Sequence, residues 1–425
     1  MRKNKFLLFI LGVIVFQSGT SGILLSQIPN AVQYNSGWKA SEAIVAKLSN
    51  DSKGFNYFEE KVPDYSLPDI LTSNDGTKIQ TESQWNKIRR PEIVELFLKN
   101  MFGRVPETLY KVEFNVVSTK NALRGMATQK QVEITIHRED KSLLIHLTLV
   151  TPNGTLRPVP TFLLIDPWYY QKNSPDWKEK IEYWPVNEAI KRGYGMAIFD
   201  ATDLDTDVFD DFKNGIHGLL DVNTRPDDAW GTIAAWAWGA SRCMDYLVTD
   251  KDVAANLVAV VGHSRAGKTA LWAGAEDTRF AMVVSNESGA GGAALARRRF
   301  GETVERLNTV FPHWFCMNFK KYNNKEDSLP FDMHMLLSLI APRALYIDCA
   351  DEDLWGDPKG SYLSLYSAIP VFNLLGVKSD IKKSMPPLNK QVIRGRVGFH
   401  IRNGSHNLLL KDWNWFMDFA DLVLK

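Results

Sequence analysis

Hydrophobic residues alternate with polar ones in three stretches of the chain, at 110–117, 131–137 and 143–150. A period of two is typical of strands that are buried on one face and solvated on the other. We expect these three strands to pair in an antiparallel manner and to form one edge of a sheet.

Apolar blocks follow, and they alternate with helical patterns. The blocks lie at 160–165, 194–199 and 258–261, and the helical patterns lie at 186–192 and 230–248. Strands that alternate with helices imply right-handed crossovers and a parallel sheet covered on both faces. The chain is therefore predicted to be of the α/β class, a three-layer αβα sandwich with a mostly parallel central sheet and an antiparallel edge.

The N-terminus has the pattern of an export signal. Arg2, Lys3 and Lys5 precede an apolar run at 6–16, which is too short to span a bilayer comfortably. We assign residues 1–22 to a signal peptide. The protein is then expected to be secreted or periplasmic, without stable membrane association once the signal is removed.

The remaining chain is assigned to two parts. Residues 23–106 are predicted to wrap around the main domain and to contain a helix near 91–101, and residues 107–425 are predicted to form the catalytic domain. Hydrophobic content of 45% and charged content of 23% are ordinary for a globular protein. Because 50 basic residues face 49 acidic ones, binding of nucleic acid through a global basic field is not expected.

Cysteine and histidine spacing argues against metal chemistry. Cys243, Cys316 and Cys349 allow at most one internal disulfide bond. No Cys/His spacing typical of zinc sites occurs, and the chain has no His-Glu-x-x-His motif. We expect no metal and no cofactor.

Residues 258–268 carry the strongest chemical signal. A β-branched run ends at Gly262, Ser264 follows, and a helix-forming run continues to residue 275. This is the sequence form of a nucleophile elbow, in which a serine on a strand-to-helix turn is exposed above the sheet. The backbone N–H of Arg265 would then point at an oxyanion. The fifth position of the motif is Ala266, where a glycine is usual.

An activated serine needs a base, and hydrolases of this type place the histidine last in the chain. Four histidines follow Ser264, and they are His313, His334, His400 and His406. His406 lies in a turn-like loop between the strand-like residues 398–401 and the apolar C-terminal run, where a base would reach the top of the sheet. His400 lies within an apolar alternation and is predicted to be structural.

Two acids compete to orient that base. Glu287 follows the strand-like residues 280–286, and Asp353 comes shortly after the predicted strand 344–348. Both lie at the carboxyl edge of the sheet, where open α/β folds place their sites. The sequence does not rank them. The Asp-rich segment 200–228 is expected to be a loop over the site.

Several motifs together resemble the glucuronoyl esterases, carbohydrate esterase family 15 of the α/β-hydrolase superfamily, in their bacterial form. The similar segments are residues 61–69, 89–93, 262–272, 285–289, 330–334, 353–355 and 400–406. They extend the resemblance from about residue 56 to residue 415. The departures include Ala266, Met333 where a glutamine is common, and 166–168 where a loop richer in Gly and Asn is common.

The resemblance implies a role for each matching residue. Ser264 would be the nucleophile and His406 the base, Glu287 matches the usual acid of the family, and Asp353 matches the alternative acid of bacterial members. Arg265 would lie beside the tetrahedral intermediate, where a fixed positive charge stabilises an oxyanion.

Three further positions would bind the sugar. Lys268, Glu302 and Trp355 match residues that hold the hydroxyls and ring face of a glucuronate unit. The alternative interpretations are that Lys268 is a solvated lysine, that Trp355 belongs to the core, and that Arg265 pairs with a surface acid.

The implied function is that of a serine esterase acting on esters of (4-O-methyl-)glucuronic acid, as in the lignin–carbohydrate ester links of glucuronoxylan. The protein is expected to act as a monomer. One alternative is another serine hydrolase of the same fold, such as an acetyl xylan esterase or a peptidase. The other is a non-catalytic sugar-binding relative.

Overall fold

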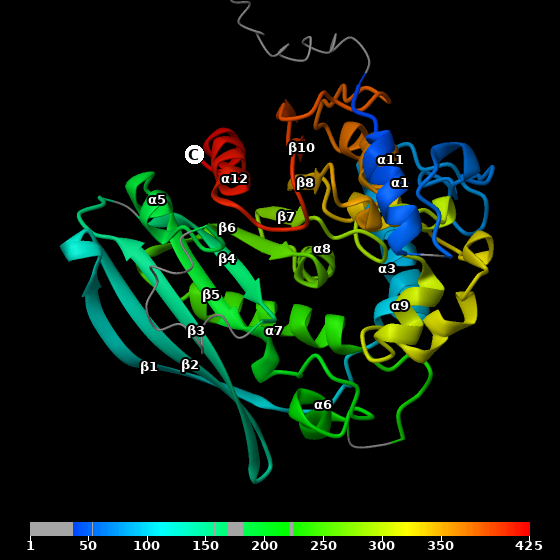
Figure 1. The fold of residues 1–425 in the computed structure, drawn as a ribbon. Helices are drawn as coiled ribbons and strands as arrows, with labels where there is room; N and C mark the ends of the chain where they lie inside the picture. Colours follow the sequence, from blue (N-terminus) through cyan, green and yellow to red (C-terminus); the bar gives the residue numbers. More distant parts are fainter. Residues whose placement is uncertain (1–36, 53, 157, 169–181, 222–223) are drawn as a thin grey trace, which may run out of the picture. The chain divides into compact units, whose positions relative to one another are not determined.

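A sheet with ten strands in the described residues runs through the protein in the order β1-β2-β3-β5-β4-β6-β7-β8-β10-β9 (Figure 1). The computed structural model describes residues 37–52, 54–156, 158–168, 182–221 and 224–425. The predicted signal peptide, residues 1–22, lies outside them. The strands are β1 (Lys111–Ala122), β2 (Ala127–Arg138), β3 (Lys141–Pro152), β4 (Val159–Asp166), β5 (Gly195–Asp200), β6 (Val253–His263), β7 (Met282–Asn286), β8 (Ala344–Ala350), β9 (Val392–Arg394) and β10 (Val397–Arg402).

The pairing confirms the predicted mixed sheet. Strands β4 to β8 and β10 pair in parallel, and β1, β2 and β3 form the expected antiparallel edge. One feature was not predicted, because the short strand β9 pairs antiparallel with β10 and gives the sheet a second antiparallel edge. Three residues are too few for a recognisable alternation of hydrophobic and polar positions.

Helices cover both faces of the sheet, which confirms the three-layer α/β architecture (Figure 1). The longer helices are α1 (Glu42–Asp51), α3 (Arg90–Phe97), α5 (Val186–Lys191), α6 (Gly215–Leu220), α7 (Thr232–Leu247), α8 (Arg265–Glu276), α9 (Val304–Val310), α10 (Met333–Ser338), α11 (Pro358–Leu374) and α12 (Leu410–Val423).

Strand β6 shows how the layers are specified. Val258 and Val260 belong to the core shared with α7, α8, α10 and α11, whereas Ala259 and Val261 belong to the core shared with α5 and α12. Because successive side chains of a strand point to opposite faces, a continuous apolar run is needed where both faces are covered. This is why the central strands lack alternation.

The helix predicted near 91–101 is present as α3, and its buried face packs into the same core. Phe97 lies against Phe331, with ring centroids 4.3 Å apart, and near Trp272 of α8 at 6.3 Å. Residues Gly37–Lys425 form one compact unit. The division at residue 106 stays a prediction.

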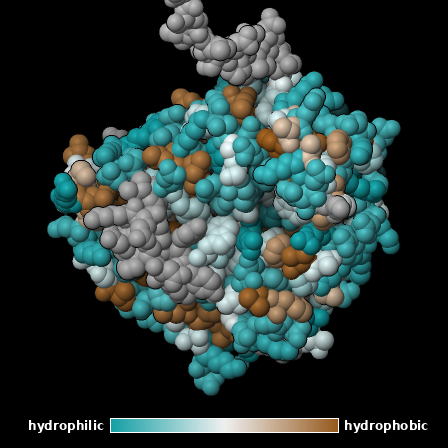
Figure 2. All heavy atoms as spheres, viewed as in Figure 1, coloured by the Kyte–Doolittle hydropathy of each residue, from teal (hydrophilic) through white to brown (hydrophobic). Residues whose placement is uncertain are grey.

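The segment 200–228 is more ordered than the predicted loop. Its described residues contain the 3₁₀ turn η6 (Ala201–Asp203) and helix α6. The three cysteines are buried and free. Among the described helices, none combines the length and the apolar character that crossing a membrane requires. On the face drawn in Figure 2, hydrophobic residues occur in small groups between larger hydrophilic areas.

Candidate active site

Ser264 stands on a sharp turn between β6 and α8. Its backbone has φ 57° and ψ −121°, a conformation that non-glycine residues rarely adopt. The turn is held by a hydrogen bond of 2.8 Å from the Ser264 N–H to the carbonyl oxygen of Asn286 at the end of β7. Such strain concentrates at functional sites and is the geometry of a nucleophile elbow.

Small residues make this turn possible. A Cβ atom on Gly262 would lie 1.9 Å from the carbonyl oxygen of Ala266, and one on Gly267 would lie 3.0 Å from that of Asn286. A side chain at residue 262 would collide with the backbone of α8, and one at residue 267 would crowd the end of β7. Ala266 itself is fully buried and does not have a positive φ, so its backbone conformation does not require the usual glycine.

A cavity of about 410 Å³ opens beside the serine. All eight residues singled out in the sequence line it, and they are Ser264, Arg265, Lys268, Glu287, Glu302, Asp353, Trp355 and His406. Arg306, Phe311 and Trp314 complete much of the wall. The structure thus brings together residues that are spread over 143 positions of the chain, from residue 264 to residue 406.

The two competing acids both reach the same imidazole nitrogen. The Nδ1 atom of His406 lies 2.8 Å from Asp353 Oδ2 and 3.1 Å from Glu287 Oε2. The Glu287 side chain is fully buried, whereas that of Asp353 is 10% exposed and that of His406 is 41% exposed. The sequence left open whether Glu287 or Asp353 orients His406, and in this structure both acids contact its Nδ1 atom.

Burial and these contacts shift the pKa values of His406 and Glu287. Burial alone would lower the pKa of His406, but its hydrogen bonds and charge interactions with Asp353 and Glu287 outweigh burial and raise the pKa to about 10. Burial raises the pKa of Glu287 to about 7, although His406 and Arg402 oppose the shift. The imidazolium form of His406 is thus strongly favoured by its surroundings.

Arg402, which sequence reasoning did not single out, fixes the loop that carries His406. Its Nη1 atom donates to the carbonyl oxygen of Ser405 at 3.0 Å and its Nη2 atom donates to that of Asn407 at 2.8 Å, so both neighbours of the histidine are held. Its guanidinium also bonds to Glu287 Oε1 at 2.5 Å. Arg402 lies inside the motif 400–406, which was the available signal.

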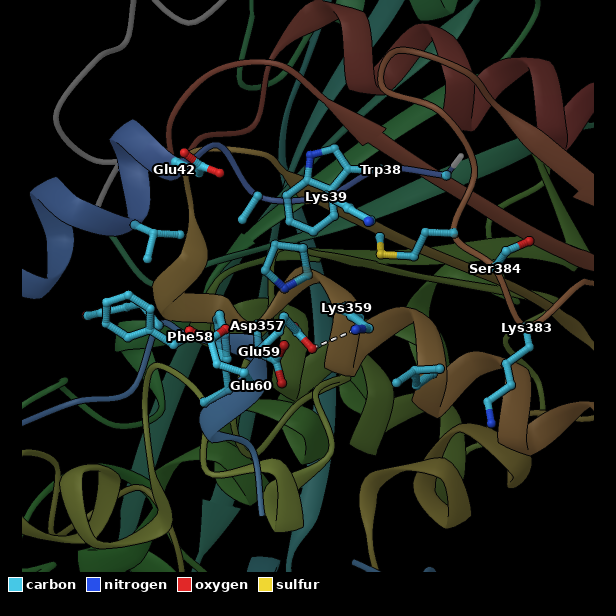
Figure 3. Close-up of a pocket in the computed structure, with 18 of the residues that line it drawn as sticks. Trp38, Lys39, Glu42, Phe58, Glu59, Glu60, Asp357, Lys359, Lys383 and Ser384 are labelled. Carbon is cyan, nitrogen blue, oxygen red and sulfur yellow. Dashed lines mark hydrogen bonds and ion pairs between the residues drawn. The ribbon is translucent and has the colours of Figure 1, made fainter. Parts of the chain in front are cut away.

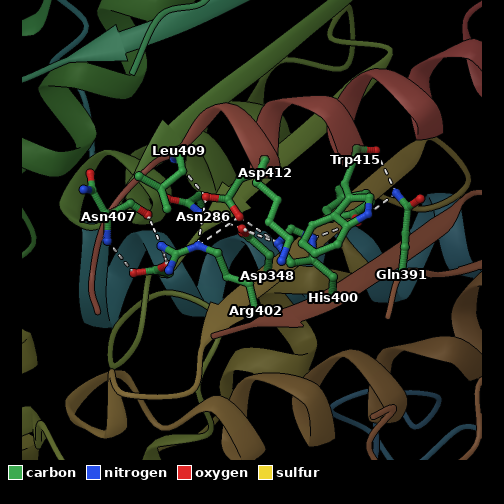
Figure 4. A network of polar contacts seen from close by, with 12 residues as sticks. Asn286, Asp348, Gln391, His400, Arg402, Asn407, Leu409, Asp412 and Trp415 are labelled. Carbon is green, nitrogen blue, oxygen red and sulfur yellow. Dashed lines mark hydrogen bonds and ion pairs between the residues drawn. The ribbon is translucent and has the colours of Figure 1, made fainter. Parts of the chain in front are cut away.

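A buried network continues behind Arg402 (Figure 4). Asp412 receives two bonds of 3.0 Å from Arg402 Nε, and its Oδ1 atom lies 3.0 Å from His400 Nε2. Tyr346 contacts the other nitrogen of His400 at 2.9 Å. His400 is therefore a packed member of this network, as predicted, and does not line the cavity.

Among the described residues, two groups of donor atoms have the spacing of a metal site, namely His263 with Glu287 and His406, and Asp348 with His400 and Asp412. In each group the guanidinium of Arg402 already bonds to a carboxylate. A positive charge is thus supplied by the protein itself, and hydrogen bonding accounts for both groups.

Lys268 is not a solvated lysine. Its side chain is 5% exposed, and Nζ donates to the carbonyl oxygens of Ser288 at 2.6 Å and Ala290 at 2.7 Å. Nζ also lies 3.7 Å from Glu302 Oε2. Burial lowers the pKa of Lys268 and raises that of Glu302, while each charge opposes the shift of the other.

Trp355 is half-buried at the wall of this cavity. Its ring meets that of Phe55 edge-on, with centroids 4.7 Å apart, and the guanidinium of Arg306 lies 5.9 Å from its centroid. It follows Asp353 in the short turn η10 (Leu354–Gly356). One chain segment therefore supplies both a carboxylate to His406 and an aromatic face to the cavity.

Arg265 does pair with an acid, Asp207, whose side chain is 19% exposed and does not itself line the cavity. Its Nη1 atom contacts Asp207 Oδ2, and its guanidinium lies 4.8 Å from the ring centroid of Trp314 and 5.2 Å from that of Phe311. Asp207 belongs to the segment 200–228 and was not singled out, because nothing in its local sequence distinguishes it from the neighbouring aspartates.

A second cavity, of about 770 Å³, lies between α1, the turn η1 (Glu59–Lys61) and the start of α11 (Figure 3). Its wall includes Trp38 and an ion pair of 2.6 Å between Glu59 and Lys359. None of the eight candidate residues lines it. Although it is larger, it lacks a serine on an elbow and a histidine, so the chemistry belongs to the cavity at Ser264.

Comparison with known proteins agrees with this geometry. The family model described as glucuronyl esterase, fungi, matches residues 134–376. A carbohydrate esterase from an unknown prokaryotic organism is 42% identical over 399 residues, which cover 87% of this chain and 92% of that protein. The 4-O-methyl-glucuronoyl methylesterase of Schizophyllum commune is 28% identical over 336 residues, which cover 74% of this chain and 75% of that protein.

Structural comparison gives the same result. The solved glucuronoyl esterase from Solibacter usitatus matches with a TM-score of 0.81 at 38% identity, covering 86% of this chain and all of that one. The fold, the elbow and these similarities agree, and the chain belongs to the glucuronoyl esterases, carbohydrate esterase family 15, a family of carboxylic ester hydrolases.

Proposed function

We propose that this protein hydrolyses esters of (4-O-methyl-)glucuronic acid, as in the lignin–carbohydrate ester links of glucuronoxylan. The observation that carries the proposal is a single cavity that combines Ser264 on an elbow, His406 between two carboxylates, and a wall formed by Lys268, Glu302 and Trp355. The names of the relatives, which include 4-O-methyl-glucuronoyl methylesterases, support the same substrate class.

In the first step the neutral form of His406 accepts the proton of the Ser264 hydroxyl, and Oγ attacks the ester carbonyl carbon. The tetrahedral oxyanion is stabilised by the Arg265 guanidinium and by the Arg265 N–H at the start of α8, where backbone donors have no helical partner. The intermediate collapses, His406 returns its proton to the leaving alcohol, and an ester between Ser264 and the uronic acid remains. Water then attacks that ester while His406 accepts its proton, and His406 returns this proton to Ser264 Oγ as the bond to the acid breaks.

Asp353 and Glu287 would stabilise the imidazolium that forms in each step. Their contacts with Nδ1 leave Nε2 available to Ser264, and they favour the charged form of His406. Glu287 is additionally held by Arg402 and by the Asn407 N–H at 2.9 Å. We assign both acids to the catalytic machinery, with Glu287 as the more rigidly held one.

The part of the wall formed by Lys268, Glu302 and Trp355 would recognise the sugar. Two of the three N–H groups of Lys268 Nζ donate to backbone carbonyls. The third can donate to a sugar hydroxyl, and that hydroxyl can in turn donate to the Glu302 carboxylate, which lies 3.7 Å from Nζ. The half-buried ring of Trp355 offers an apolar face to the sugar ring. An acetyl ester would make no use of this wall.

We further propose that the protein is exported and acts as a monomer. The basic residues and the apolar run at the N-terminus support export. A glucuronoxylan substrate is a polymer outside the cell, so an exported enzyme would meet it directly.

A panel of esters tests the proposed substrate class. The purified protein is incubated with benzyl glucuronate, with benzyl galacturonate, which differs only in the configuration of one hydroxyl, and with acetylated xylan. The proposal expects the highest kcat/KM on the glucuronate ester. Activity on acetylated xylan alone would instead assign the protein to the acetyl xylan esterases, and activity on no ester would indicate a sugar-binding relative.

A further inference from the structure

Asp207 makes contacts that neither the family resemblance nor the proposed mechanism explains. It lies in the loop between η6 and α6, and its Oδ2 atom contacts the Arg265 guanidinium. Its other oxygen, Oδ1, accepts a hydrogen bond of 2.7 Å from Trp314 Nε1 and lies 3.0 Å from His313 Nε2. The side chain is 19% exposed, so these charged contacts are largely shielded from water.

The lasting positive charge beside Asp207 is that of Arg265. Burial lowers the pKa of His313 and so disfavours its charged form, whereas the Arg265 guanidinium stays charged at neutral pH. Arg265 is therefore the main cationic partner of the Asp207 carboxylate. Trp314 and His313 fix the direction in which that charge faces.

The N-terminus of α7 anchors both sides of this contact. Asp205, two residues before Asp207, accepts from Thr232 Oγ1, and its carbonyl oxygen accepts from Trp236 Nε1 at 2.8 Å. On the other side, the Thr232 N–H donates to the carbonyl oxygen of His313 at 2.9 Å, and the N–H of the next residue donates to Trp314 at 3.2 Å. The Asp207 carboxylate is thus held from two directions by one long helix.

Arg265 needs such an anchor. Arg265 directly follows Ser264 in the chain, and the rings of Trp314 and Phe311 lie against its guanidinium. Ring contacts of this kind leave the guanidinium free to rotate within its own plane. Among the described residues, Nε has no hydrogen-bond partner although it is buried. One edge of the guanidinium is therefore tied to Asp207, and a donor at another position remains for a ligand oxygen.

We propose that Asp207 is a positioning residue for the reaction. It acts through Arg265 and holds the guanidinium where the ester oxyanion develops. The inference rests on the proposed oxyanion role of Arg265. A preorganised donor needs no reorganisation when charge develops, so loss of Asp207 affects the transition state more than substrate binding.

A double-mutant cycle tests the inference. We would measure kcat and KM on benzyl glucuronate for the wild type, Asp207→Asn, Arg265→Ala and the double variant, with the Tm of each. Asp207→Asn is expected to lower kcat by roughly 10- to 100-fold, the size of a charge-assisted hydrogen bond, with KM changed less than about threefold. In the Arg265→Ala background the same substitution is expected to change kcat less than about twofold.

Asp211→Asn is the matched control. Asp211 lies in the same loop, but its side chain is 60% exposed and pairs with Lys213 at 2.8 Å. It has a positive φ of 59°, which asparagine tolerates well. The kcat of the Asp211→Asn variant is expected to equal that of the wild type.

The outcomes separate the inference from the proposed function. A wild-type kcat in Asp207→Asn, or an equal loss in both backgrounds, would overturn the positioning role while the role of Arg265 stands. A wild-type kcat in Arg265→Ala would overturn both. If Asp207→Asn fails to fold, Asp207→Glu replaces it, because the charge is kept while the guanidinium is displaced. A reduced kcat at an unchanged Tm supports the inference, and a wild-type kcat contradicts it.

Discussion

Two carboxylates on one imidazole nitrogen predict that neither acid alone accounts for the activity. We consider Asp353→Asn, Glu287→Gln and the double variant. In Asp353→Asn the contact of 2.8 Å to His406 Nδ1 loses its charge, while the contact of 3.1 Å from Glu287 remains. A hydrogen bond to a charged group contributes about 1.5–3 kcal/mol, so kcat is expected to fall roughly 10- to 150-fold.

The Glu287→Gln variant is expected to lose more, because Glu287 also binds Arg402 and the Asn407 N–H. Beyond the loss in kcat, the free energy of unfolding should fall by ~1–3 kcal/mol, since Arg402 keeps only Asp412 as a charged partner. The double variant leaves the imidazolium without a counter-charge. Its kcat is expected to fall by ~10⁴, as when a triad has lost its only acid.

The pH dependence of kcat/KM distinguishes this account from a simple loss of structure. Because Asp353 helps to raise the pKa of His406, Asp353→Asn should lower that pKa and move the acid limb of the profile to lower pH. The assay is hydrolysis of benzyl glucuronate between pH 6 and 11, a window that includes the raised pKa of about 10, with the Tm of each variant as a control for folding. A wild-type kcat and an unshifted acid limb in Asp353→Asn would refute the shared role of the two acids.

Three further predictions concern the wall, the turn and the imidazole. Trp355→Ala should raise KM about 2- to 10-fold with little change in kcat, because the ring faces the sugar and not the reacting atoms; steady-state kinetics checks this. Gly262→Ala should lower the free energy of unfolding by at least ~3 kcal/mol in urea titrations, because its Cβ would meet the Ala266 carbonyl oxygen at 1.9 Å. His406 has a pKa raised from 6.5 to about 10, so its ion pairs stabilise the fold below pH 6.5 and are lost as the pH rises through 10. The Tm difference between the wild type and His406→Ala should therefore shrink between pH 6.5 and pH 10, and a constant difference would contradict the shift.

Much of the fold follows from local patterns. The alternation in β2 and the apolar runs of β4 to β6 were readable because burial follows the sequence pattern along these strands. Strand β1 also alternates in sequence, but at the edge of the sheet it is exposed along almost its whole length. Strand β9 was missed because it spans only Val392–Arg394. The position of β5 between β3 and β4 is set by crossovers and not by any local signal.

The residues of the site also divide into those that a local sequence pattern reveals and those that it does not. Ser264 was found because the elbow needs small residues at fixed offsets, and His406 was found from chain order. Asp207 and Arg402 were missed, because their importance lies in contacts with residues 58 and 115 positions away, Arg265 and Glu287. Nothing in the local sequence of a loop aspartate or of a strand-end arginine records such partners.

The central claim is that Ser264 forms the covalent bond in hydrolysis of a glucuronate ester. The most direct measurement compares the initial rate of acid release from benzyl glucuronate by the wild type and by Ser264→Ala, with equal Tm as the folding control. The account predicts turnover by the wild type and a loss of at least ~10³-fold in the variant, as expected when a nucleophile is removed. Equal rates in the two proteins would contradict it.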